Sequence, residues 1–575
     1  MMKKHFILFI FLLLSGIIFS QKKKKEKIET EEISVVKPYA PTVSDAFKIR
    51  VNPGIDSVEI NQKKEIDYSI NSIPVASTFS PAKGKAKTLL REPKERFYQN
   101  FVSAGYGNYN TPIIEVFAHS NTSKYNDFGG FINYHSSGGG IKDVQLDDNF
   151  LDLDVNLFYK QSERYFEWRA NANFDHLVRN WYGLPEEINF NSNTLKSIDE
   201  NQSYTDLSLS GQIEFFDALV HRGDVEFSRF FDKEKSKENN AVISGIVDFP
   251  VWNELIYTKI SLEFLNGNFD QNYFQTDNID YTFFNIGLSP NFELLRENLK
   301  LNLGANLYYS ITDTSDGSKF YAYPNITASY NISDEVFIAY AGVVGDLEQN
   351  SYKKYVLENP FVSPTLDIKR TSRQYNAYLG VKGIYNSNFR FNAKVAYGSE
   401  KDKPLYKLNP SKTDGRITVE KGYEAGNSFQ VIYDDVNTIS ASAEVIFDFN
   451  RAFKFGGNIE FNSYSLSNED HAWNLPMLKS TLLARYIHKK WNAGADLFFA
   501  TDRKDEIIII PLSTVDSKTN SAYFDVNLNG LYNINDKISV FVKLNNILSD
   551  NYQEYTNFKV QGLQFFGGIK YQFDL

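Results

Sequence analysis

The chain has 575 residues, a net charge of −10 and no cysteine. The missing cysteines exclude disulfides and thiolate chemistry, and the acidic balance argues against a nucleic-acid partner, because such partners require a basic surface. Hydrophobic residues make up 42% of the chain, yet no apolar run after the first twenty residues reaches the roughly 20 that a membrane-spanning helix needs.

The first twenty residues are predicted to be a signal peptide. Lys3 and Lys4 precede an apolar core, Phe6–Phe19, and the polar stretch from Gln21 follows the small residue Ser20. A basic start, a short apolar core and a small residue before the cut are the marks of an export signal. We therefore expect cleavage after Ser20; an uncleaved anchor is the alternative.

Residues 21–96 are expected to form an extended, irregular periplasmic tail. They contain a basic run, an acidic run and scattered prolines, with no helical period and little alternation. An extended apolar segment can bind a protein by adding a strand to a sheet edge, and the alternative is an ordinary linker. The candidate partner-binding residues, for a periplasmic or outer-membrane protein, are Ile33, Val35, Val36, Pro38, Tyr39 and Phe47.

From about residue 97 apolar and polar residues alternate. In 151–159 (LDLDVNLFY) the apolar side chains fall on one face, and Asp152 and Asp154 fall on the other. The segments 299–308, 389–397 and 524–532 repeat this pattern. A period of two over nine residues predicts a strand with one apolar and one polar face.

Twenty-two such strands are predicted, and short and long connections alternate between them. Transmembrane barrels have short periplasmic turns and longer outside loops, and a sheet in lipid must close because lipid offers no hydrogen bonds. We therefore predict an all-β fold, an antiparallel transmembrane barrel over 97–575 in the cell outer membrane, with lipid against its apolar face. The strands are expected near 97–107, 111–121, 126–136, 149–162, 164–176, 202–216, 219–231, 238–250, 254–268, 280–295, 299–311, 320–332, 336–346, 373–387, 389–399, 427–449, 452–466, 476–488, 490–504, 521–534, 538–549 and 561–575.

The polar faces of these strands are expected to line the lumen. Such a lining is typical of a water-filled channel or of a site for a polar plug. The charged residues among them are Glu115, Asp152, Asp154, Glu214, Lys300, Arg390, Lys394, Lys543 and Lys570.

No catalytic, cofactor or metal site is predicted. The histidines show no metal-binding spacing, and His119 and His135 are expected to be solvated in the lumen. An acidic cluster near 143–154 offers calcium ligands or is simply solvated. The apolar run Ile507–Ile510 lies in an outside connection, where it contacts a surface partner or packs against neighbouring loops.

The second-last predicted strand and the loop after it carry a recurring pattern of residues, Val542, Asn545, Ile547, Asp550 and Tyr552. In this pattern the C-terminal strands resemble those of TonB-dependent receptor barrels of the Bacteroidota type. In the final strand the candidate barrel-insertion signal consists of Phe565, Ile569, Tyr571 and Phe573. The segment RNWYGLP at 179–185 is also similar to these receptors.

This resemblance implies a 22-stranded barrel that acts in transport across the outer membrane. An enzyme is not expected, because outer-membrane lipases and proteases use far smaller barrels than the predicted strand count gives. One departure is large, because only residues 21–96 separate the expected cleavage site from the first strand. The family's plug domain is longer, so the chain looks like a relative without it. The alternative function is a structural or scaffold subunit of an outer-membrane complex, with an occluded barrel.

Overall fold

The structure is a computed structural model that describes residues 98–123, 125–251, 254–333, 336–386 and 388–575. The expected signal peptide (1–20) and the whole of the expected tail (21–96), with candidates Ile33, Val35, Val36, Pro38, Tyr39 and Phe47, lie outside the described residues. The tail and signal therefore stay predictions.

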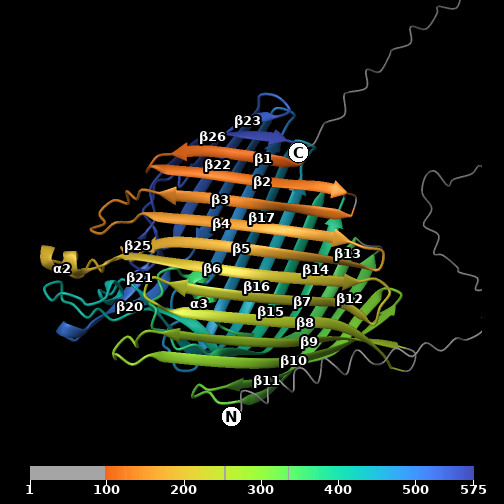
Figure 1. The fold of residues 1–575 in the computed structure, drawn as a ribbon, viewed down its shortest axis with the longest axis horizontal. Coiled ribbons are helices and arrows are strands. Elements are labelled where there is room, and N and C mark those ends of the chain that lie inside the picture. The colour runs from red at the N-terminus through yellow and green to blue at the C-terminus, as the bar shows by residue number, and fades with distance from the viewer. Residues whose placement is uncertain (1–97, 124, 252–253, 334–335, 387) are drawn as a thin grey trace, which may run out of the picture. The chain divides into compact units, whose positions relative to one another are not determined.

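The predicted 22-stranded antiparallel barrel is confirmed (Figure 1). The first strand pairs with the second and also with the last, from Asn100↔Phe573 to Gly107↔Phe566, so the sheet closes on itself. The barrel strands are β1 (Asn100–Gly107), β2 (Thr111–Ser123), β3 (Asn126–Ser137), β4 (Phe150–Ser162), β5 (Phe166–Asn180), β6 (Asn201–Phe215), β7 (Val220–Asp232), β8 (Lys237–Val251), β9 (Glu254–Phe269), β10 (Ile279–Arg296), β11 (Leu299–Thr312), β12 (Lys319–Ser333), β13 (Phe337–Gln349), β14 (Arg370–Tyr385), β15 (Phe389–Leu408), β16 (Phe429–Asp448), β17 (Phe453–Leu466), β18 (Leu478–Ile487), β19 (Trp491–Ala500), β22 (Tyr523–Asn533), β23 (Ile538–Asn545) and β26 (Gln564–Phe573).

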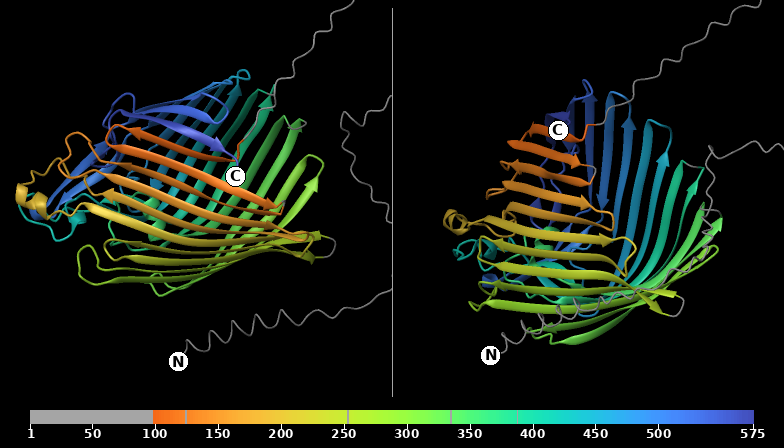
Figure 2. Two further views of the ribbon diagram at one scale, coloured as in Figure 1. Left: turned by 45° about the horizontal axis from the view of Figure 1, so that its top comes forward. Right: turned by 45° about the vertical axis from the view of Figure 1, so that its right-hand side comes forward.

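Smaller elements lie in the long connections, which gather at one end of the barrel (Figure 2). We call this end the outer mouth, because long loops face outward in such barrels. No described helix is long and apolar enough to cross a membrane. The elements are α2 (Ser192–Ser197), α3 (Tyr352–Glu358), η2 (Gly422–Glu424), η3 (Ile510–Leu512), β20 (Arg503–Ile509), β21 (Thr514–Asn520), β24 (Gln553–Tyr555) and β25 (Phe558–Lys559).

Two predicted outside loops contain more strand than expected. β15 continues past residue 399 to Leu408 and pairs with β16 across a bulge between Glu400 and Lys403. The predicted loop 505–520 is largely the hairpin of β20 and β21. These parts project beyond the apolar band and pack against other loops, so the alternation that marks a strand facing lipid is absent there.

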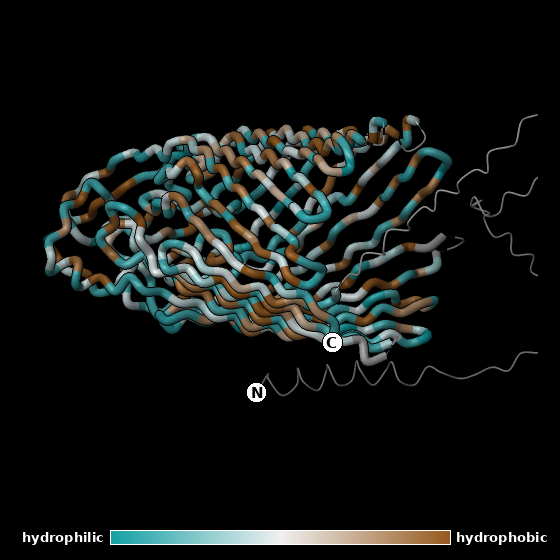
Figure 3. Tube along the Cα trace, turned by 90° about the horizontal axis from the view of Figure 1, so that it is seen from above, coloured by the Kyte–Doolittle hydropathy of each residue, from teal (hydrophilic) through white to brown (hydrophobic). Residues whose placement is uncertain are grey.

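The two faces of the wall follow the predicted alternation, which is visible along the trace in Figure 3. On the apolar face Leu157 is 57% exposed and Leu303 43% exposed, as lipid-facing side chains should be. On the polar face Asn133, Asp154 and Asp175 are successive partners in register, and Asn133 donates to Asp154 over 2.9 Å.

The predicted lumenal charges share this inner face with partners from adjacent strands. Lys300 pairs with Glu293 at 2.8 Å, and Arg390 pairs with Asp448 at 3.1 Å. His135 also lies inside, where its ring meets the edge of Phe150 at 5.0 Å. A polar wall of this kind can hold water throughout the lumen.

Exposed aromatic side chains form a belt at each edge of the apolar band. Such belts mark the membrane interfaces of outer-membrane barrels. Near the outer mouth the belt includes Tyr106, Tyr309, Phe320, Tyr397 and Phe524, and near the short turns it includes Phe249, Tyr330, Tyr385, Phe453 and Trp491.

Candidate functional site

The connection between β13 and β14, residues 350–369, folds into the barrel, and we call it the lid. The two strands bend at bulges, one at Gly345 and one at Gln374. A Cβ on Gly345 would lie 2.5 Å from the Gln374 carbonyl oxygen, so the bend requires glycine. Beyond it, Tyr308 of β11 donates to Asp346 over 2.5 Å, which holds the bent hairpin against the wall.

The first turn of α3 in the lid is capped by side chains. Ser351 is the N-cap, and its Oγ accepts from the Lys354 amide at 3.1 Å. Glu238 of β8 accepts from the amides of Tyr352 at 2.7 Å and Lys353 at 3.2 Å. These amides have no partner within the helix, and a carboxylate beside them also matches the helix dipole.

Three buried carboxylates of the wall hold this end of the lid, and we call Asp206, Asp232 and Glu238 the acidic latch. Lys353 Nζ lies 2.6 Å from Asp206, and the Tyr352 hydroxyl donates to Asp232 over 2.7 Å. Burial raises the pKa of Tyr352 well above its ordinary value, so its hydroxyl stays a donor. Each buried carboxylate thus has a partner, which offsets its desolvation.

Tyrosines hold the other end of the lid. The Tyr406 hydroxyl donates to the Glu358 carboxylate, and the Tyr555 hydroxyl donates to the Glu358 carbonyl oxygen. Tyr355 and Tyr433 join their hydroxyls over 2.7 Å. The lid is therefore tied to opposite sides of the barrel, the latch on β6–β8 and the tyrosines on β15, β16 and β24.

A hydrophobic core surrounds the lid and joins it to the other long connections. Tyr352 meets the edge of Phe269 at 4.9 Å, and Phe361 stacks on Phe558 at 3.7 Å. Buried aromatic side chains of this size dominate core energetics. The core includes Trp181, Tyr204, Phe230, Leu265, Phe269, Tyr281, Phe283, Tyr352, Tyr355, Val356, Phe361, Val362, Leu366, Leu408, Tyr423, Phe429, Ile507, Ile509 and Phe558.

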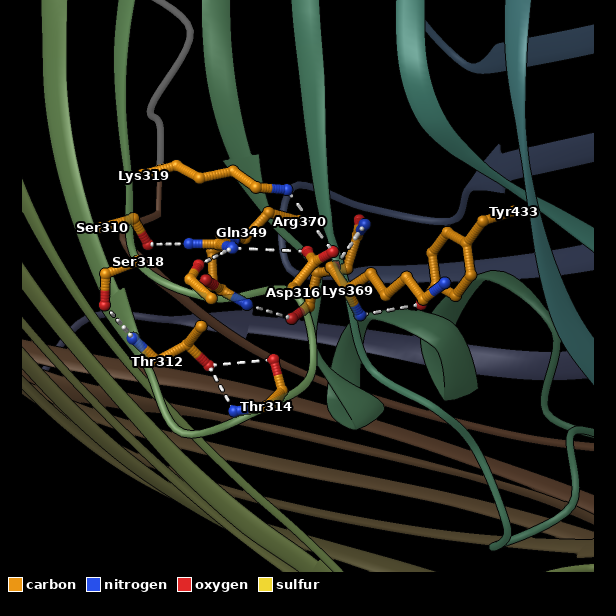
Figure 4. Close-up of polar contacts among 12 residues, drawn as sticks. Ser310, Thr312, Thr314, Asp316, Ser318, Lys319, Gln349, Lys369, Arg370 and Tyr433 are labelled. Atoms are coloured by element: carbon orange, nitrogen blue, oxygen red, sulfur yellow. Dashed lines mark hydrogen bonds and ion pairs between the residues drawn. The ribbon is translucent and has the colours of Figure 1, made fainter.

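Arg370, the first residue of β14, clamps the base of the lid (Figure 4). Its guanidinium is fully buried and donates to Ser310 Oγ at 2.7 Å and to the Gly317 carbonyl at 2.9 Å. Asp316 lies 3.3 Å from the same guanidinium and supplies the opposite charge. The planar fork of arginine suits three acceptors, so this side chain fixes the lid to the loop 313–318.

The apolar run Ile507–Ile510 packs mainly against neighbouring loops. Ile507 and Ile509 are buried in the core around the lid, whereas Ile510 is 43% exposed. The parallel bridge between Ser411 and Ile509 ties this hairpin to the 409–428 connection.

The acidic residues near 143–154 are not brought together. Asp148 accepts from the Gly140 and Ile141 amides, each at 2.9 Å, and Asp152 pairs with Arg179. Within the described residues no group of three or more acidic or histidine side chains is arranged to hold a metal.

The C-terminal candidates lie on β26. Phe565, Ile569 and Tyr571 are 49%, 57% and 43% exposed on the lipid face. Phe573 is half-buried and pairs in register with Asn100, next to the point where the barrel closes. The insertion role of these residues remains a prediction.

Sequence reasoning missed the lid, the acidic latch and Arg370. The only local signal is the N-cap serine, Ser351, before a short helix that ends near Pro360. The latch carboxylates occur within ordinary alternating strands, so nothing in the sequence near them shows that a loop covers them.

No protein-family model and no curated protein matches the chain. Among solved structures it is similar to the pyoverdine outer membrane receptor FpvA of Pseudomonas aeruginosa PAO1, with a TM-score of 0.60 and 11% identity over 84% of this chain and 79% of that one. It is also similar to the ferric enterobactin receptor PfeA of Pseudomonas aeruginosa, with a TM-score of 0.59 and 11% identity over 82% of this chain and 80% of that one. With the ferric-catecholate import receptor Fiu of K12 E. coli the TM-score is 0.58 and the identity 10%, over 83% of this chain and 82% of that one. The chain therefore has the fold of the outer-membrane receptor barrels.

Proposed function

We propose that the chain is an outer-membrane transport barrel of the TonB-dependent-receptor type, in the form found in Bacteroidota and without the usual plug. One observation carries the proposal: at the outer mouth of a polar-lined 22-stranded barrel, the lid is bonded to β6 and β8 on one side and to β15 and β16 on the other. The wide lumen of 22-stranded outer-membrane transporters is plugged, so transport through such a barrel requires the occluding segment to move. The lid supplies the occlusion, and a bound substrate would shift it toward an open state.

The tail supplies the periplasmic contact in this proposal. Residues 31–49, with Val35 at the centre of the β-prone segment, would add a strand to a periplasmic or outer-membrane partner. The similar structures are receptors and importers by name, which supports transport rather than enzymatic activity.

Conductance across planar bilayers tests the proposal. The double variant Lys353→Met, Glu238→Gln removes the ion pair of the acidic latch with Lys353 and weakens its contact with the helix amides. We expect larger and more frequent openings than for the wild-type chain. The control is Lys233→Met, which removes an exposed pair with Asp199 at 2.8 Å in a neighbouring turn and should leave conductance unchanged.

A scaffold subunit with an occluded barrel is the second candidate. The tightly packed aromatic core at the outer mouth favours it, because that core resembles the permanent interior of a folded domain. In this case the latch variant and the wild-type chain would be equally silent in the bilayer, and the transport proposal would be wrong.

A further inference from the structure

A polar pocket of about 320 Å³ lies in the lumenal wall formed by β14–β17. Its floor is a row of residues that are partners in register across four strands, Asn376, Gly398, Thr438 and Tyr464. The adjacent residues Tyr397 and Ile439 are exposed on the opposite, lipid face. The pocket therefore opens to the lumen.

The pocket lies directly below the base of the lid. Arg373, three positions after the clamp residue Arg370, forms its upper edge together with Glu400 and Lys403. Arg373 also pairs with Glu348, and Glu348 pairs with Lys354 of α3. A chain of alternating charges thus runs from the pocket to the lid.

The charges of the pocket are balanced, and three of the four charged side chains form ion pairs. Arg373 Nε lies 3.3 Å from Glu400, and Lys403 pairs with the same carboxylate. Glu460 accepts from Asn462 Nδ2 at 2.9 Å. The two cations and two carboxylates of the lining carry no net charge, so the site does not favour a ligand of either sign.

The rest of the lining consists of amides and hydroxyls, from Asn376, Thr438, Ser440, Asn462 and Tyr464. Such groups both donate and accept hydrogen bonds. Thr438 Oγ1 is enclosed and has no hydrogen-bond partner among the described residues. The volume is at the lower end of the range for small-ligand sites, about 300–1,000 Å³.

We propose that this pocket binds a small neutral polyhydroxylated molecule, about the size of one sugar residue. Its hydroxyls would bond to the amide and hydroxyl lining, and the Glu460 carboxylate would accept from them. Arg373 would carry the effect of binding through Glu348 to the lid. The inference rests on the proposed transport function, since it places a substrate subsite beneath the closed mouth.

Gly398 allows the pocket to be filled without disturbing the wall. The atoms nearest to a Cβ built there are 3.7 and 3.8 Å away, so Gly398→Leu would project into the pocket and leave every ion pair intact. Gly530→Leu is the matched control, because nothing lies within 4 Å of its Cβ and its partner Val542 is exposed on the lipid face.

Calorimetry on the full chain in detergent tests the proposal, with glucose, galactose and mannitol as neutral probes. Glucose 6-phosphate and glucosamine are the charged counterparts. We expect saturable binding of at least one neutral probe. Gly398→Leu should weaken this binding by at least about tenfold through the loss of several hydrogen bonds, and Gly530→Leu should leave it unchanged.

Three results would overturn the proposal: no neutral probe binds to chain that shows the heat-modifiable migration of a folded barrel, a charged probe binds more tightly than its neutral counterpart, or Gly398→Leu binds like the wild-type chain. The bilayer experiment needs no ligand. Binding without conductance would therefore contradict transport alone, and conductance without binding would contradict the pocket alone.

Discussion

Replacing Glu238 by alanine would leave two amides of the lid and one hydroxyl of the wall without an acceptor. The carboxylate accepts from the Tyr352 amide at 2.7 Å, the Lys353 amide at 3.2 Å and the Tyr281 hydroxyl at 2.7 Å. Each unpaired buried donor costs about 1–3 kcal/mol. Only the two lid amides separate from Glu238 when the lid opens. Water that enters the vacated space recovers part of their cost, so we take the lower limit, about 2 kcal/mol in total.

A change of about 2 kcal/mol in the free energy of lid opening corresponds to roughly thirtyfold more open state. Hydrogen exchange of a peptide covering 352–358, read by mass spectrometry, should speed up by this factor in Glu238→Ala. Glu238→Gln keeps one acceptor oxygen, so its effect should be only about 1 kcal/mol, or roughly fivefold.

The control for this experiment is Glu293→Ala. Glu293 is also a lumenal carboxylate, and it pairs with Lys300 at 2.8 Å, but it lies near the short turns. It should leave exchange in the lid unchanged. If Glu238→Ala exchanges no faster than Glu293→Ala over 352–358, the acidic latch does not hold the lid and our reasoning is wrong.

Three further predictions follow from the wall, the tail and the outer hairpin. Leu303→Arg on the lipid face should cost about 2–4 kcal/mol and reduce the heat-modifiable folded band in outer-membrane fractions, whereas Asp154→Asn in the lumen should not; equal damage would mean that the faces are reversed. Deletion of 22–49 should remove co-purifying proteins, and Val35→Pro should have the same effect because it removes a backbone donor. If the same proteins still co-purify, the tail binds no partner and serves only as a tether. Burial raises the pKa of Asp505 in β20 above its ordinary 3.8, so the folded hairpin retains the proton and should lose stability as pH rises from 3.8 through the raised pKa. Asp505→Asn should abolish this pH dependence, measured as hydrogen exchange of 503–520 corrected for intrinsic rates. If the variant keeps the pH dependence, another titrating group causes it.

The wall of the barrel could be predicted from the sequence because the alternation of apolar and polar residues is a local pattern within each strand. Val155 faces lipid and Asp154 faces the lumen as neighbours in the chain, and the alternation alone shows it. The lid could not be predicted, because its contacts span the chain: Lys353 reaches Asp206 across 147 positions, and Tyr352 reaches Glu238 across 114. A seven-residue helix is too short to show a sequence pattern that predicts such distant partners.

The same limit explains the pocket and the extended strands. Gly398 and Glu400 read as ordinary positions of an alternating segment, and only the register of four strands makes them part of one site. The part of β15 after residue 399 lies beyond the bilayer, where loops and not lipid surround it. Its residues there therefore do not alternate in polarity.

The spacing of the two aromatic belts sets the thickness of membrane that suits this barrel. On β12, Phe320 belongs to one belt and Tyr330 to the other. Ten residues at about 3.3 Å each give about 33 Å along the strand, and a tilt of about 40° reduces this to a height of about 25 Å. A typical bilayer has a hydrocarbon thickness of about 30 Å, and the bacterial outer membrane is thinner than average. Hydrophobic mismatch would thus oppose residence in a thicker bilayer, and short-chain lipids are the natural choice for reconstitution.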